Sequence, residues 1–189
     1  MVTVTCEPRC DEAQAFPTRL RLTARGIAAT LAQGEICPPR HVFSVGVEGE
    51  TLHILWRVYY SPELLRKELA ESRGIDKFIV ACLGSRHHDG YLRQECLAVV
   101  LAGDAPWLTP YILQLAGEYV VEIVDDIARG IASRDAGPLA AFVRENPGYM
   151  ATLERRITSY WSCYHRHTYP DRKDYPGSRV AACLRRLVE

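Results

Sequence analysis

The sequence predicts a mainly helical α+β protein, in which a small N-terminal α/β portion with a β-hairpin packs on a compact helical bundle. Two observations lead to this fold class. Apolar residues recur at helical spacing from residue 61 onward, and two runs rich in Val, Ile and aromatics precede that point. The expected division is therefore 1–60 for the α/β portion and 61–189 for the helical domain, docked as one unit.

The first forty residues predict mixed structure. Val2 and Val4 alternate with threonines, which favours a short strand. Thr23 is suited to cap a helix that ends at Gly34. These elements are too short to form a core alone, so we expect them to lie against the rest of the chain.

The clearest β signal predicts a hairpin over 41–60. Its two runs, 41–47 and 51–60, are separated by a short turn that contains Gly49. Alternate residues of the second run are apolar, so one face of the hairpin must pack on the helices. The residues of that face are Leu52, Ile54, Trp56, Val58 and Tyr60.

The rest of the chain predicts helices. Ser61 is a typical N-cap and Pro62 fits the first helical position. The longest apolar helix begins at Pro106 or Pro110 and ends near Gly130. The other helices are expected near 75–83, 91–101, 138–144, 147–166 and 178–188.

One turn carries a family resemblance. The segment from Asp89 to Arg93 (Asp-Gly-Tyr-Leu-Arg) lies between two apolar helices and resembles the inter-helix corner of a HEAT-type repeat. The resemblance covers about 75–101. It implies that Asp89 caps the second helix, that Arg93 braces the corner, and that the helices form a short HEAT-like array. The resemblance also suggests the protein-binding role of that family. Solenoids need about three repeats to bury a continuous core, and the sequence shows one.

The composition excludes several classes of protein. Lys and Arg number 23 and Asp and Glu number 23, and this zero net charge disfavours a nucleic-acid binder. No run of about 18 apolar residues is present, so no membrane span or membrane partner is expected. The seven cysteines form no Cys-x-x-Cys motif, and with no secretory signal we expect a cytoplasmic protein.

The charge is unevenly spread along the chain. Residues 61–133 hold 7 basic and 11 acidic side chains, a balance of −4. Residues 134–189 hold 10 basic and 6 acidic side chains, a balance of +4. The two regions either attract one another within the fold or give the surface a positive end.

Glu118 and Glu122 are the candidate catalytic residues. They are four residues apart within a strongly apolar segment, which would place them on one helical face. Two carboxylates at this spacing suit a metal or an acid–base pair. Alternatively they form a polar stripe, because buried carboxylates need cations. The candidate partners are Arg57, Arg86, Arg93 and Arg156.

The segment Arg86-His87-His88-Asp89 is the second candidate site. The histidines bind zinc only if Cys163, His165 and His167 fold back onto them, since zinc takes about four ligands. Otherwise Asp89 caps a helix and the histidines are solvated or locally hydrogen-bonded.

The third candidate is the aromatic and basic run 160–169, which includes Tyr164, His165 and His167. Tyr160, Trp161 and Tyr164 share a helical face with Leu153 and Ile157, which favours a core stripe. The alternative is a partner-binding patch made of Tyr164, Tyr169 and Tyr175, because exposed tyrosines are favoured at interfaces.

The leading functional hypothesis is a non-catalytic interaction or adaptor protein that uses a helical face for a protein partner or for self-association. No phosphate-binding glycine loop, nucleophile elbow or His-Glu-x-x-His motif is present, so no cofactor is expected. The first alternative is a small enzyme or metal-binding protein centred on Glu118 and Glu122. The second is nucleic-acid binding through the basic C-terminal third.

Overall fold

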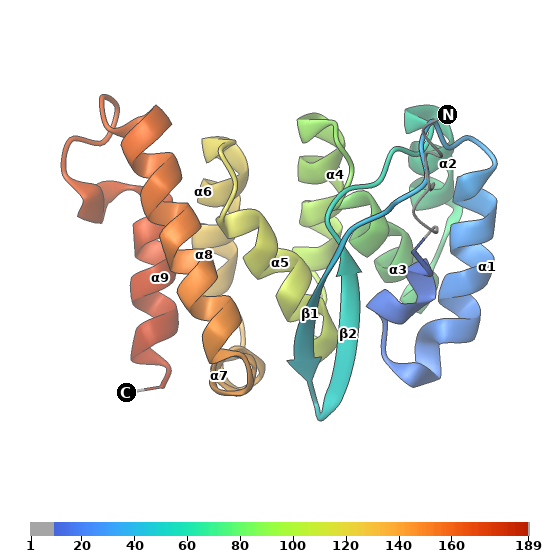
Figure 1. Ribbon diagram of the computed structural model, residues 1–189, viewed down its shortest axis with the longest axis horizontal. Coiled ribbons are helices and arrows are strands. Elements are labelled where there is room, and N and C mark those ends of the chain that lie inside the picture. Colours follow the sequence, from blue (N-terminus) through green and yellow to red (C-terminus); the bar gives the residue numbers. More distant parts are fainter. Residues whose placement is uncertain (1–9, 189) are drawn as a thin grey trace, which may run out of the picture.

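The computed structural model describes residues 10–188 and confirms a mainly helical protein with a small β-hairpin (Figure 1). The predicted strand at Val2 and Val4 lies outside the described residues. The strands are β1 (Val42–Val47) and β2 (Glu50–Leu55). The α-helices are α1 (Arg21–Ala32), α2 (Pro62–Glu71), α3 (Gly74–Gly84), α4 (Gly90–Leu101), α5 (Thr109–Ala116), α6 (Val121–Ala132), α7 (Ala136–Glu145), α8 (Pro147–Tyr160) and α9 (Pro176–Arg186).

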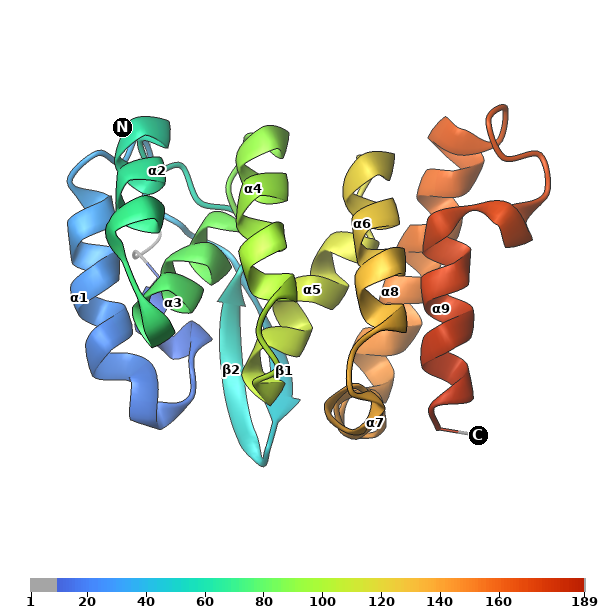
Figure 2. The same cartoon turned by 180° about the vertical axis from the view of Figure 1, so that it is seen from behind.

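The helices stand in a row, with α1 and α2 at one end and α9 at the other (Figures 1 and 2). Helix α5 crosses the middle of the row and is buried along its length. One hydrophobic cluster runs through the molecule and includes side chains from the hairpin as well as from the helices. No helix of residues 10–188 has the length and apolar character to cross a bilayer.

The hairpin forms where the sequence predicts it, but its second strand is shorter. Strands β1 and β2 pair antiparallel around a turn in which Glu48 and Gly49 have positive φ, the conformation that tight hairpin turns require. Strand β2 ends at Leu55 rather than near residue 60. Beyond it, Val58 pairs with His87 in a parallel bridge. The chain therefore leaves β1 and runs beside the segment that follows α3.

The hairpin is fixed to the α7–α8 corner by Asn146. Its side-chain oxygen accepts from Gly46 N at 2.7 Å, and its amide nitrogen donates to Gly46 O at 2.8 Å and to Phe142 O at 2.9 Å. One buried side chain therefore joins the sheet to two helices.

The single long helix expected from Pro106 or Pro110 to Gly130 is wrong. The chain forms two helices there, α5 and α6, with a break over 117–120. The break begins at Gly117, where a Cβ atom would lie 2.8 Å from Cδ1 of Leu153. Glycine at this position lets α8 pack closely against the break, since a larger side chain would displace the end of the Leu153 side chain.

The expected core stripe at the end of α8 is confirmed for Leu153 and Ile157 but is wrong for Tyr164. Leu153 and Ile157 are buried, but Tyr160 and Trp161 are only half-buried and Tyr164 is 65% exposed. A π-helical turn over Trp161–His165 follows α8 directly. Such a turn holds more residues than an α-helical one, so it shifts the phase of the apolar stripe and turns Tyr164 toward solvent.

Candidate functional site

Glu118 lies at the centre of a buried ion cluster between the α5–α6 break and three arginines. Its side chain is 1% exposed. Arg57 Nη1 donates to Glu118 Oε1 at 2.8 Å, and Arg86 Nη2 lies 3.5 Å from the same oxygen. Arg93 Nε lies 3.0 Å from Oε2 in an ion pair that lacks good hydrogen-bond direction. The predicted structural role of Glu118, pairing with arginines, is confirmed for all but Arg156.

The two fully buried arginines of the cluster also bind backbone carbonyls. Arg86 donates to Leu55 O at 3.1 Å and to Trp56 O at 2.9 Å, at the end of the hairpin. Burial lowers the pKa of Arg86 to about 10, against the opposing effect of Glu118, so this side chain stays charged at neutral pH. Burial opposes the charge of Glu118 too, but the three guanidinium groups outweigh it and lower the pKa of this carboxyl.

The α3–α4 corner is held by hydrogen bonds of Asp89 and Arg93. Asp89 caps α4 by accepting from Tyr91 N at 2.8 Å. Arg93 Nη1, one turn later, donates to His87 O at 3.0 Å and to His88 O at 2.8 Å. Arg93 thus braces the α3–α4 corner and also pairs with Glu118 at the corner that the α5–α6 break forms. One side chain therefore connects the two corners.

His87 is an internal part of the same corner. It is fully buried, its Nδ1 accepts from Asp89 N at 3.0 Å, and its Nε2 donates to Tyr60 O at 3.0 Å. Because Nδ1 acts as an acceptor, the ring must be neutral. Burial lowers the pKa of His87, more than the bond to Tyr60 O raises it.

The protonation of His87 predicts a pH-dependent stability. The unfolded state binds a proton near pH 6.5 and the native state only at lower pH, so this contribution is complete above 6.5 and is lost as the pH falls. Between about pH 7 and pH 5 we expect the free energy of unfolding to fall by at most ~1.4 kcal/mol per pH unit from this group. Thermal melting at several pH values measures it.

The matched variants are His87→Gln, which removes the group, and His41→Gln, which removes an exposed histidine. The dependence should flatten in the first and persist in the second. An unchanged slope in His87→Gln contradicts the assignment of this pH dependence to His87.

The two corners enclose a surface pocket of about 400 Å³. Its lining consists of two acids, two tyrosines and three other residues, none of them basic: Asp89, Gly90, Tyr91, Gln94, Tyr119, Val120 and Glu122. We call this the corner pocket. Tyr91 is 78% exposed and Tyr119 52% exposed, so both side chains are accessible from solvent.

A tyrosine cluster extends the corner pocket toward the end of α8. Tyr119 lies 6.4 Å from both Tyr160 and Tyr164, measured between ring centres. His165 Nε2 donates to Tyr119 O at 2.8 Å, and its ring stacks on the buried Tyr175 at 5.4 Å. The π-helical turn therefore holds the backbone of Tyr119 in place through His165.

The structure separates the two predicted catalytic residues. Glu118 is enclosed by arginines, whereas Glu122 is exposed in the first turn of α6 and lines the corner pocket with Asp89. Among the described residues Glu122 forms no ion pair. The pattern of two acids on one helical face is therefore not present.

The other predicted binding residues are distributed around this site. Arg57, Arg86 and His87 belong to the supporting cluster, with Arg57 one-third exposed. His88 is exposed and stacks on Tyr59 at 5.1 Å between ring centres. Tyr164 and His165 join the corner pocket through Tyr119, and His167 is exposed beyond them.

No metal centre forms among residues 10–188, because no three His, Cys, Asp or Glu side chains converge there. The alternative zinc set needs Cys163, His165 and His167 to meet the His87 corner. The ring nitrogens of His87 bind backbone groups instead.

Sequence reasoning missed Tyr91 and Tyr119, which contribute the exposed rings of the corner pocket. Each directly follows a corner acid or its glycine, in Asp89-Gly90-Tyr91 and in Glu118-Tyr119. Both tyrosines lie at a helix boundary, Tyr91 in the first turn of α4 and Tyr119 in the α5–α6 break, and this position was the available signal.

No family model, no curated protein and no solved structure matches this chain. The HEAT resemblance therefore stays local, at the α3–α4 corner.

Proposed function

We propose that the protein is a non-catalytic interaction protein and that its corner pocket receives a basic side chain of a protein partner. The lining of the pocket is the observation that supports this function. Two carboxylates, Asp89 and Glu122, face a cavity with two exposed tyrosine rings and no lining cation. A lysine or arginine side chain is complementary to both features, through ion pairs and through cation–π contact.

The surroundings of the pocket suit protein recognition. Tyrosines are enriched at interfaces because they bury a large rigid area at low entropic cost. Tyr91, Tyr119 and Tyr164 are all more than half exposed. The adjoining tyrosine cluster can contact residues that flank the basic side chain of the partner.

The ion cluster beneath the pocket supports its geometry. Arg93 pairs with Glu118 and so holds the α3–α4 corner against the α5–α6 break. The two halves of the pocket are therefore fixed before a partner arrives, which reduces the ordering cost of binding. The carboxylate-centred enzyme is less well supported, because it needs Glu118 and Glu122 in one cavity.

Titration with defined peptides tests this function. The probe is a capped five-residue Gly/Ser peptide with a central arginine, followed by amide chemical shifts of the protein. We expect saturable shifts at Gly90, Tyr91 and Tyr119 with a Kd on the order of 1 mM, because one ion pair and one ring contact supply little energy.

The matched variants are Glu122→Arg and Glu71→Arg, which change the net charge equally. Glu71 is exposed at the end of α2 and does not line the corner pocket. Affinity should fall at least ~10-fold in Glu122→Arg and stay unchanged in Glu71→Arg.

Two outcomes would overturn the proposal. One is the absence of saturable shifts, or equal affinity in Glu122→Arg. The other is equal binding of the same peptide with a central glutamate, which would mean that the pocket has no preference for a positive charge.

A further inference from the structure

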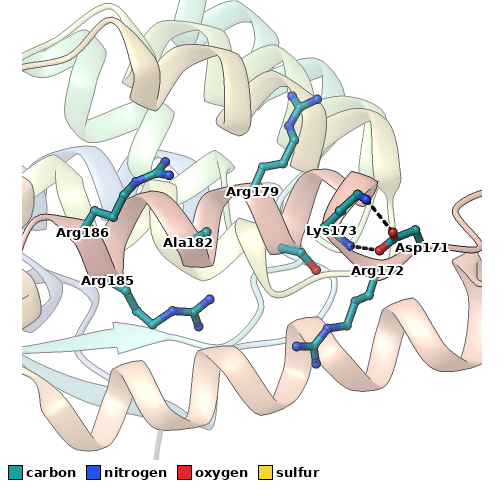
Figure 3. Close-up of a pocket in the computed structure, with 8 residues that line it drawn as sticks. Asp171, Arg172, Lys173, Arg179, Ala182, Arg185 and Arg186 are labelled. Carbon is teal, nitrogen blue, oxygen red and sulfur yellow. Dashed lines mark hydrogen bonds and ion pairs between the residues drawn. The ribbon is translucent and has the colours of Figure 1, made fainter.

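The outer face of α9 carries a second pocket, a trough of about 570 Å³ at the end of the helical row. Five of its eight lining residues are basic and one is acidic. They are Asp171, Arg172, Lys173, Ser178, Arg179, Ala182, Arg185 and Arg186 (Figure 3). We call this surface the α9 trough.

The spacing of residues along α9 creates the trough. Ser178 and Ala182 are one turn apart, so two small side chains form its floor. Arg179 and Arg186 extend to one side of the helix, and Arg172 and Arg185 to the other (Figure 3). Basic side chains of the trough therefore lie on both sides of α9.

The cations of the trough are available for exchange with an external anion. Lys173 pairs with Asp171 at 2.8 Å, Arg185 with Glu154 at 2.9 Å and Arg179 with Asp125 at 3.5 Å. Each basic partner is more than half exposed, and surface pairs of this kind contribute only about 0–1 kcal/mol. Among the described residues Arg186 forms no ion pair.

We propose that the α9 trough binds the phosphodiester backbone of a nucleic acid. Arginine is the preferred phosphate ligand because its planar guanidinium group donates two parallel hydrogen bonds. From Arg179 to Arg186 the helix advances about 10 Å, the length of roughly three stacked nucleotides of one strand. No aromatic side chain lines the trough, so the contact reads phosphates rather than bases.

This inference is independent of the proposed function and departs from the expectation based on net charge. The formal net charge is zero, but counterion release depends on the cations that touch phosphates. The structure gathers five of them on one face, within the region that the sequence shows to be basic.

Fluorescence anisotropy with a labelled oligo-dT of about 12 nucleotides tests the proposal over a range of salt concentrations. If about four cations contact phosphates, the logarithm of the binding constant should fall with the logarithm of the salt concentration with a slope near −3. In the double variant Arg179→Gln/Arg186→Gln, the slope should become shallower by about 1.4 and affinity at low salt should drop at least ~10-fold.

The control is Arg19→Gln/Lys67→Gln, which removes two exposed cations far in sequence from the trough. Its net charge equals that of the Arg179→Gln/Arg186→Gln variant. It should bind like the parent, and melting curves verify that both variants fold. Glu122→Arg, which tests the corner pocket, should not weaken oligonucleotide binding.

Three results would each overturn the proposal. They are no binding at low salt, an equal loss in the Arg19/Lys67 control, and equally tight binding of polyglutamate with the same charge. The last would assign the trough to an acidic protein segment.

Discussion

Glu118→Gln should destabilise the protein by about 3–5 kcal/mol, because it removes the only carboxylate that the ion cluster contains. Arg86 and Arg93 are each 1% exposed and would keep their charges in a site without a counter-charge. For a chain of this length the melting temperature should fall by roughly 6–20 °C. Thermal or urea unfolding followed by circular dichroism measures the change.

Two comparisons isolate the role of the Glu118 charge. Glu122→Gln removes an exposed carboxylate and should stay within ~0.5 kcal/mol of the parent. The parent should also lose stability as the pH falls below about 4.5. The arginines lower the pKa of Glu118 in the native state despite its burial, so the unfolded state takes up the proton first. Glu118→Gln should lack this acid-dependent part. If it melts like the parent, the cluster does not stabilise the fold.

Asn146→Ala should destabilise the protein by about 1–3 kcal/mol, since it removes the side-chain partners of the half-buried N–H and C=O groups of Gly46. The side chain of Asn146 makes hydrogen bonds to both the N–H and the C=O of Gly46 and to Phe142 O. Alanine satisfies none of the three. The free energy of unfolding in urea gives the magnitude, and hydrogen exchange at Gly46 locates it.

Asn146→Asp retains the acceptor for Gly46 N but directs a buried carboxylate oxygen at two carbonyl oxygens, so it should destabilise the protein at least as much as alanine. Ser44→Ala removes an exposed hairpin hydroxyl that contacts His53 at 2.9 Å and should be near neutral. An Asn146→Ala protein that unfolds like the parent is incompatible with Asn146 as the link between hairpin and helices.

Much of the fold could be predicted because local signals agree with the final packing. Ser61 and Pro62 start α2 as expected, with Ser61 Oγ accepting from Leu64 N. The hairpin turn at Gly49 and the cap at Asp89 also depend on neighbouring residues alone. Caps and tight turns are local interactions, so the sequence is sufficient to place them.

The failures arise where distant residues decide. The α5–α6 break packs against Leu153, which lies in a helix more than thirty residues away. The outward turn of Tyr164 depends on a π-helical turn that the apolar spacing does not reveal. The positions of Glu118 and Glu122 follow from this break, so the sequence predicted an acid pair that the fold separates.

The ion cluster has a consequence for how the molecule folds. Its three cations come from the segment after the hairpin, the segment after α3 and the first turn of α4, and its one anion from the α5–α6 break. None of these segments reaches its final environment unless the others are already assembled. The hairpin portion and the helical portion are therefore expected to unfold together. A truncated chain that lacks Glu118 would bury guanidinium groups in an apolar interior with no carboxylate to pair with them.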